Sequence, residues 1–173
     1  MRLFFFGLLR DEDMREVVLG RSLPRRHFRA AHLCDARLVT LRNETYPVLV
    51  PAPGQRVPGV VAEGLAEPDI DRIVFFESVE YALTAVTVEL AGGDVLEAQI
   101  FTMTERAGVL DEPWRFKDWQ DRHKARDLHQ ARLWMALHGH LAFAEADRLW
   151  DEALAAGRTI EDLVEQVCGK PRA

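Results

Sequence analysis

The sequence has only two cysteines in 173 residues, and this scarcity excludes a disulfide-stapled fold. Such folds need several cysteines at short spacings, and they occur mainly in oxidising compartments. Cys34 and Cys168 instead stand far apart, and neither belongs to a recognisable nucleophile motif. We therefore expect two reduced thiols that are buried as small apolar residues, and a cytoplasmic location.

An excess of basic residues is also missing. The chain has 22 lysines and arginines against 28 aspartates and glutamates, which gives a formal charge of −6. Proteins that bind nucleic acid usually carry a basic surplus, so we expect no nucleic-acid partner. The local basic run Arg21–Arg29 is interpreted as a solvated connection after Gly20.

Long apolar runs and cofactor motifs are absent as well. No run approaches the roughly 20 residues that a membrane span requires, so we expect no membrane association. The segment Met1–Phe6 is too short for a secretory signal peptide. The histidines lack the i, i+4 spacing of a helical zinc pair, and the glycines form no P-loop or dinucleotide-binding pattern. We therefore expect neither a metal nor a cofactor.

The residue pattern changes near position 110. Before it, the sequence predicts a helix capped by Asp11, a second helix from Pro68 to Phe76, and a series of short strands. The strands are expected at residues 3–6, 31–41, 46–50, 57–65, 81–90 and 95–103, with turns at Pro51–Gly54 and Gly92–Gly93. After it, only helices are predicted. These patterns indicate an α+β protein in two parts, residues 1–108 and residues 109–173.

The second part is expected to hold three helices, at about residues 113–139, 141–156 and 159–169. Thr159 caps the last of them, and the basic residues of the first, among them Arg126, are interpreted as a solvated face. All four tryptophans lie in this part, where we interpret them as core anchors: Trp114, Trp119, Trp134 and Trp150. Because so many large apolar groups must be buried, we expect the first helix to pack on the strands and the other two to close over it.

Two stretches carry candidate chemistry. Gly7 stands between a predicted strand and a predicted helix, where its bare backbone permits N–H groups to face an anion. Glu77 directly follows Phe75 and Phe76, and burial beside these rings would raise the pKa of its carboxyl group towards neutrality. Taken alone, Glu77 also fits a structural role at a helix end or in a pair with an arginine.

A series of short motifs runs through residues 2–103 in a fixed order. These are Phe6-Gly7-Leu8-Leu9, Asp35-Ala36-Arg37-Leu38, Tyr46-Pro47-Val48-Leu49-Val50-Pro51, Val57-Pro58-Gly59-Val60-Val61, and Phe76-Glu77 with Glu80-Tyr81. Together they resemble the γ-glutamylcyclotransferase-like (AIG2-like) family, in which the first motif is usually Tyr-Gly-Ser/Thr-Leu and the last Phe-Glu-Gly-x-x-Tyr. The chain departs from the family at Phe6 and Leu8, which lack the usual hydroxyl groups, and at Ala82-Leu83, where family members often have an arginine.

The resemblance implies a small mixed β-barrel over residues 1–108 and a C-terminal helical extension over residues 109–173. It also implies a transferase (an acyltransferase) that cyclises a γ-glutamyl amide or amine to 5-oxoproline and releases the amine. Glu77 is then the general acid/base, without a cofactor or metal, and a small γ-glutamyl compound is the partner. A homodimer is left open. The substrate-binding residues implied are Phe6, Gly7, Leu8, Leu9 and Tyr81.

Two alternatives stand beside this interpretation. Glu80 is the rival carboxylate, which we interpret as solvated or hydrogen-bonded at the mouth of the next strand. The chain is alternatively a catalytically silent member that binds a small acid and uses its helices as a protein-interaction surface. Phe6 and Leu8 favour this second alternative, because they remove hydroxyl groups from the expected ligand site.

Overall fold

The computed structural model describes residues 1–77, 81–103 and 108–169, apart from the side chain of Tyr81. Its strands are β1 (Leu3–Phe5), β2 (Phe28–Leu41), β3 (Pro47–Ala62), β4 (Tyr81–Leu90), β5 (Val95–Met103) and β6 (Val109–Pro113). Its α-helices are α1 (Glu12–Leu19), α2 (Glu67–Glu77), α3 (Phe116–Arg122), α4 (Lys124–Ala136), α5 (Phe143–Ala155) and α6 (Ile160–Cys168). Two short 3₁₀ helices are η1 (Leu8–Arg10) and η2 (Arg25–His27). The chain is therefore α+β, as predicted.

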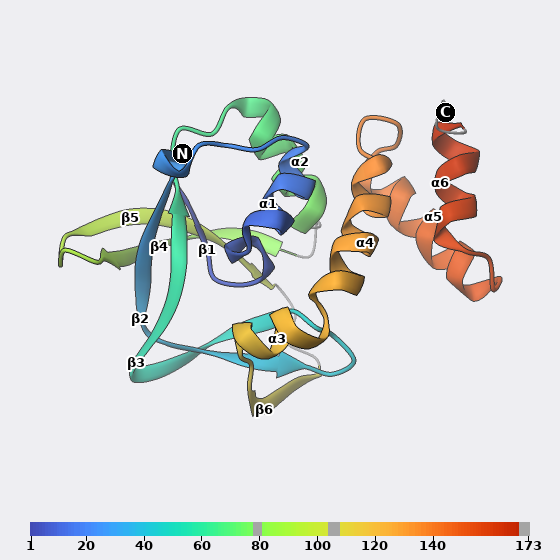
Figure 1. Cartoon of the computed structure of the whole chain (residues 1–173). Helices are drawn as coiled ribbons and strands as arrows, with labels where there is room; N and C mark the ends of the chain where they lie inside the picture. Colours follow the sequence, from blue (N-terminus) through green and yellow to red (C-terminus); the bar gives the residue numbers. More distant parts are fainter. Residues whose placement is uncertain (78–80, 104–107, 170–173) are drawn as a thin grey trace.

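Five strands close into a barrel (Figure 1). The order is β3-β1-β5-β4-β2, and β2 pairs back with β3 to complete the ring. Strands β1 and β5 are parallel, with Leu3 opposite Gln99, whereas the other neighbours in the ring are antiparallel. The mixed β-barrel is thus confirmed. Strand β6 pairs with β2, Val39 lying opposite Pro113. The sheet therefore continues past residue 108, where only helices were expected.

Strand β3 is one long strand, and the prediction of two strands separated by a turn at Pro51–Gly54 is wrong. Strand β2 pairs with β3 on both sides of this segment, with a register shift beside Asp35. Asp35 and Gly54 have φ values of 55° and 77°, and the Gly54 N–H donates to Oδ1 of Asp35 at 2.7 Å. The turn-forming residues produce a bulge instead of a chain reversal, because the neighbouring strand keeps supplying hydrogen bonds on either side.

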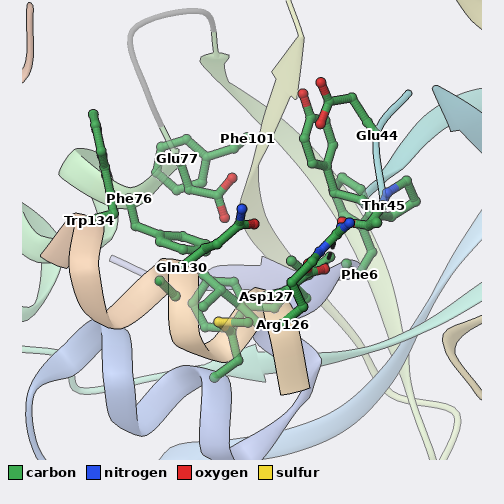
Figure 2. A pocket seen from close by; sticks show the side chains of 18 of the residues that line it. Phe6, Glu44, Thr45, Phe76, Glu77, Phe101, Arg126, Asp127, Gln130 and Trp134 are labelled. Atoms are coloured by element: carbon green, nitrogen blue, oxygen red, sulfur yellow. Dashed lines mark hydrogen bonds and ion pairs between the residues drawn. The ribbon is translucent and has the colours of Figure 1, made fainter. Parts of the chain in front are cut away.

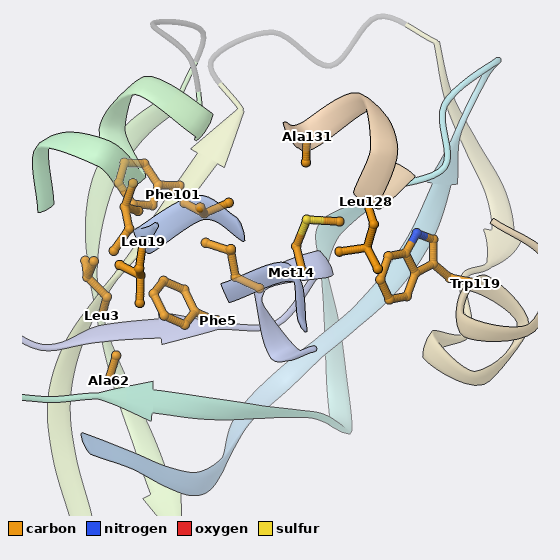
Figure 3. Close-up of a cluster of buried hydrophobic side chains, with 12 residues drawn as sticks. Leu3, Phe5, Met14, Leu19, Ala62, Phe101, Trp119, Leu128 and Ala131 are labelled. Carbon is orange, nitrogen blue, oxygen red and sulfur yellow. The ribbon is translucent and has the colours of Figure 1, made fainter. Parts of the chain in front are cut away.

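Helix α1 begins where its cap was predicted. Oδ1 of Asp11 accepts hydrogen bonds from the backbone N–H groups of Asp13 and Met14, at 3.1 and 3.3 Å. Because α1 begins directly after Asp11, the side chains of Met14 and Val18 face the core, and both are fully buried. Figure 3 shows the core that results, in which strands, α1 and the C-terminal helices share one continuous cluster. Its labelled members are Leu3, Phe5, Met14, Leu19, Ala62, Phe101, Trp119, Leu128 and Ala131.

The first C-terminal helix is shorter than predicted, because α3 and α4 are separate helices that meet at His123. The backbone of His123, with φ −122° and ψ −25°, leaves the helical range. The break lets the indole N–H of Trp119 reach Oδ2 of Asp127 at 2.8 Å. A continuous helix holds residues eight apart about 12 Å from each other along its axis, which disfavours this contact. The buried hydrogen bond between Trp119 and Asp127 therefore goes together with the break between α3 and α4.

The last helices extend away from the barrel (Figure 1). Helix α4 lies against α1 and α2, and α6 packs against α4 and α5. The ring of Trp134 in α4 stacks on Phe75 of α2 with centroids 5.2 Å apart, and it meets Trp150 of α5 at 5.4 Å. One aromatic cluster thus joins the end of α2 to the helices of the C-terminal part.

The expectation that both cysteines are buried is wrong for Cys34. This residue is exposed on β2, and its Sγ lies 3.8 Å from Oε2 of Glu89, whereas Cys168 is partly buried. Neither forms a disulfide. Among the helices of the described residues, none combines the length and the apolar character needed to span a bilayer.

Candidate active site

A cavity of about 460 Å³ opens where β1 ends (Figure 2). Its volume lies within the usual range of small-molecule sites, about 300–1,000 Å³. Most of its lining comes from the segment Phe6–Leu9, the connection Glu44–Pro47 between β2 and β3, the end of α2, helix α4 and helix α5, and residues of β1, α1 and β5 complete it. Residues that are far apart in the sequence, from Phe4 to Trp150, therefore line one cavity.

Glu77, the last residue of α2, directs its carboxylate into this cavity (Figure 2). The residue keeps some exposed surface, but its carboxyl group lies beside the aromatic wall formed by Phe76 and Phe101. Burial raises the pKa of Glu77 to about 7, and no cation or hydrogen-bond donor of the described residues offsets it. A carboxyl group with this pKa can accept and donate a proton at neutral pH.

Gly7 lies in the cavity wall between β1 and η1, and Phe6, Leu8 and Leu9 line the same wall. A Cβ atom at Gly7 would lie 3.3 Å from Cγ and Cδ of Pro47, so glycine allows this segment to approach the start of β3. The N–H groups at the start of η1 have no carbonyl partner within the helix. The structure thus brings the Gly7 segment and Glu77 to one cavity.

Helix α4 contributes residues that the sequence analysis missed. Arg126, Gln130 and Trp134 follow one another four residues apart, and all three line the cavity. The side-chain amide of Gln130 points toward the carboxylate of Glu77 (Figure 2). Arg126 lies on a solvated face, as interpreted, with its side chain 58% exposed, and it also lines the cavity. The four-residue spacing is a signal that could have identified this stripe.

Asp127, next to this stripe, is buried and fully occupied by hydrogen bonds. Its Oδ2 accepts from Oγ1 of Thr45 at 2.7 Å and from Nε1 of Trp119 at 2.8 Å. Its Oδ1 accepts from Nε and Nη2 of Arg126, at 3.0 and 2.9 Å. With both oxygens engaged, Asp127 is suited to holding Arg126 and the Glu44–Pro47 connection in place, and not to proton transfer.

Two residues of the sequence analysis cannot be placed. Glu80, the rival carboxylate, lies outside the described residues, as does the side chain of Tyr81. The backbone of Tyr81 begins β4 opposite Met103. The assignment of Tyr81 to substrate binding therefore stays a prediction.

The fold and the cavity together define a class of protein, in which a closed barrel of five mixed strands carries a cavity lined by a glutamate and by a glycine segment. Residues 3–121 match the family described as "Gamma-glutamyl cyclotransferase, AIG2-like". The chain belongs to this family. The match runs from β1 through most of α3 and ends before α4.

Individual relatives agree with this membership. The chain is 28% identical over 125 residues to AIG2-like protein D of Arabidopsis thaliana, which covers 69% of this chain and 79% of the relative. A solution structure of an Arabidopsis thaliana protein has a TM-score of 0.55 at 21% identity, covering 75% of this chain and 86% of that one. A crystal structure of an AIG2-like protein from Mus musculus has a TM-score of 0.51 at 21% identity, covering 66% and 84%. These two structures are similar in fold.

Proposed function

We propose that the protein cyclises a γ-glutamyl amide or amine to 5-oxoproline and releases the amine. One observation carries the proposal. The carboxylate of Glu77, which has a pKa of about 7 and no ion-pair or hydrogen-bond partner among the described residues, lies in the same cavity as the Gly7 segment. The first offers a proton acceptor and the second offers backbone N–H donors, and these are the two functions that the cyclisation requires.

The reaction needs little else from the protein. The α-amine of the substrate attacks its own γ-carbonyl carbon, so a new C–N bond closes a five-membered ring. Glu77 takes a proton from the attacking nitrogen and then gives one to the leaving nitrogen as the original C–N bond breaks. Holding the substrate in a folded conformation removes much of the entropic barrier, because both reacting groups belong to one molecule.

The other cavity residues take roles that fit their chemistry. Backbone N–H groups of Gly7, Leu8 and Leu9 bind the α-carboxylate, and the side chain of Phe6 forms an apolar wall. The amide of Gln130 faces Glu77, where its N–H group can stabilise negative charge that develops on the γ-carbonyl oxygen. A homodimer stays a prediction, and so does the cytoplasmic location that the scarcity of cysteines suggests.

The test is to incubate the purified chain with a set of γ-glutamyl compounds and to measure 5-oxoproline by mass spectrometry. We expect kcat/KM to rise with pH through about 7, because only the ionised carboxylate accepts a proton. Glu77→Gln keeps the shape of the side chain and removes the base, so its turnover should fall at least about 100-fold. Glu67→Gln, an exposed change in the first turn of the same helix, is the control and should retain activity.

The second candidate function is binding of a small acid without turnover. It is favoured by Phe6 and Leu8, whose apolar side chains line the cavity. Binding of γ-glutamyl compounds by calorimetry, with no 5-oxoproline from any of them, would support this candidate and rule out the enzyme. Turnover that persists in Glu77→Gln would instead assign the base to another group, with Glu80 the next to be changed.

A further inference from the structure

The Gly7 segment is held in place by an arginine that does not itself line the cavity. Nη1 of Arg15, in helix α1, donates to the carbonyl oxygens of Leu9 and Arg10, at 2.9 and 2.7 Å. The guanidinium group also lies over the ring of Phe28, with its Cζ 4.3 Å from the ring centroid. Arg15 is therefore fixed by the backbone of η1 and by the first residue of β2.

The charge of Arg15 acts mainly on peptide groups. Its guanidinium group hydrogen-bonds to two backbone carbonyls and, among the described residues, to no carboxylate. Burial lowers the pKa of Arg15, and the charges of Glu12 and Asp11 raise it only in part. An arginine keeps its charge at neutral pH even so. Because water screens little in such surroundings, the charge polarises the peptide groups that it contacts.

A first chain of hydrogen bonds leads from Arg15 to the cavity wall. The peptide bonds of this segment are trans, so the N–H and the C=O of each peptide group point in opposite directions. Arg15 holds the carbonyl oxygen of Leu9. The N–H of the same peptide group belongs to Arg10, and it donates to the carbonyl oxygen of Gly7 at 3.1 Å. The N–H on the far side of this second peptide group is that of Leu8.

A second chain runs beside the first, one residue further along the sequence. Arg15 holds the carbonyl oxygen of Arg10. The N–H of that peptide group belongs to Asp11, and it donates to the carbonyl oxygen of Leu8 at 3.0 Å. The N–H on the far side is that of Leu9. Both chains therefore end on an N–H group of a residue that lines the cavity, and neither N–H has an acceptor among the described residues.

This arrangement improves the two terminal N–H groups as donors. Hydrogen bonds in a chain strengthen one another, because each donor polarises the peptide group that accepts from it. A cation at the start of both chains therefore makes the last N–H groups more attractive to an anion. Fixing the peptide planes beforehand also lowers the cost of ordering them when a ligand binds.

We infer that Arg15 is a positioning residue of the proposed active site, which orients and polarises the N–H groups of Leu8 and Leu9 for the α-carboxylate of the substrate. The inference rests on the proposed function, and it assigns no contact with the ligand to Arg15 itself. Because the α-carboxylate takes no part in the bond changes, Arg15 should affect the binding of a carboxylate ligand and not the proton transfer at Glu77.

The test compares two ring compounds that differ by one carboxylate, 5-oxoproline and 2-pyrrolidinone. Their dissociation constants are measured by NMR titration of the amide signals. In the original chain 5-oxoproline should bind at least about tenfold more tightly, and it should move the amide-proton signals of Leu8 and Leu9 downfield. Arg15→Met, which removes the charge and both donors, should weaken the binding of 5-oxoproline about tenfold and leave that of 2-pyrrolidinone within about twofold. Arg15→Lys keeps a charged donor and should lose less than about threefold.

Arg72→Met is the matched control. Arg72 is also half-buried, and its Nε donates to a backbone carbonyl oxygen, that of Val18, at 2.7 Å. Val18 lies outside the Gly7 segment, so this variant loses a comparable hydrogen bond without disturbing either chain. It should keep both dissociation constants within about twofold of the original values.

Kinetics with a γ-glutamyl amide give a second measurement. Arg15→Met should raise KM about tenfold and leave kcat within about threefold, because it removes binding that the ground state and the transition state share. If the amide is not turned over but the binding of 5-oxoproline depends on Arg15, the inference about the N–H groups stands and the cyclisation fails. Turnover with an unchanged KM in Arg15→Met leaves the cyclisation standing and overturns the inference.

Two further results would overturn the inference. One is an equal loss of affinity for both ring compounds in Arg15→Met, or the same loss in Arg72→Met, because either would show a general effect on the fold. The other is an original chain in which the signals of Leu8 and Leu9 do not respond to 5-oxoproline. This last measurement needs no variant, so it decides the question even if Arg15→Met does not fold.

Discussion

The indole N–H of Trp119 donates to the carboxylate of Asp127 across the break between α3 and α4, at 2.8 Å. The same Oδ2 accepts the hydroxyl of Thr45 at 2.7 Å, and Nε1 of Trp114 donates to the carbonyl oxygen of Thr45 at 2.7 Å. One carboxylate therefore ties the connection between β2 and β3 to the two helices that follow β6. Two parts of the cavity lining, the Glu44–Pro47 connection and helix α4, are therefore joined at this group.

Asp127→Asn should destabilise the protein, because the new amide group cannot accept from every donor that now faces the carboxylate. Leaving a buried donor without its acceptor costs about 1–3 kcal/mol in the free energy of unfolding, measured by urea denaturation. Asp121→Asn, which alters an exposed pair with Lys117 on α3, is the control and should change this free energy by less than about 1 kcal/mol. Equal effects of the two changes would show that the buried network contributes little.

Glu77 should make the stability of the protein depend on pH. Its pKa of about 7 in the folded chain is above its ordinary value of 4.5, so the folded state holds the proton more tightly than the unfolded state. The stabilisation from this proton is complete below about pH 4.5 and is lost as the pH rises through about 7. The full effect is about 3 kcal/mol in the free energy of unfolding.

Glu77→Gln removes this dependence, because glutamine does not titrate. Urea denaturation at a series of pH values from 4.5 to 8 should therefore show the variant gaining stability relative to the original chain as the pH rises. A difference that stays constant across this range would mean that the carboxyl group is well solvated in the folded protein. Such a result would also remove the main support for Glu77 as the base.

Gly59 should tolerate no larger side chain. A Cβ atom there would lie 2.4 Å from Cζ of Phe4 and 2.5 Å from the carbonyl oxygen of Phe5, so β1 and β3 approach too closely for a methyl group. Gly59→Ala should lower the free energy of unfolding by about 1–3 kcal/mol through overpacking. Gly92→Ala, where no atom lies within 4 Å of the added Cβ, is the control for urea denaturation. A Gly59→Ala protein as stable as this control would contradict the close approach.

The sequence by itself determined the parts of the molecule that depend on neighbouring residues. The cap at Asp11, the cap at Thr159, where Oγ1 accepts the Asp162 N–H at 3.2 Å, and the turn between β4 and β5 all lie where they were predicted. The order of short motifs also identified the family and its barrel. Glu77 and the Gly7 segment could be named as a candidate site for the same reason, because each lies at an element boundary that the sequence marks.

Only the tertiary structure decided how distant segments meet. The run from Pro51 to Gly54 has the residues of a turn, but pairing with β2 makes it a bulge in one strand. The helix expected over residues 113–139 breaks at His123, where Trp119 bonds to Asp127. Gln130 lines the cavity from a helix whose local sequence indicates only an amphipathic surface. Periodicity shows which face of a helix is buried, but the element that packs against that face is set by contacts between residues far apart in the chain.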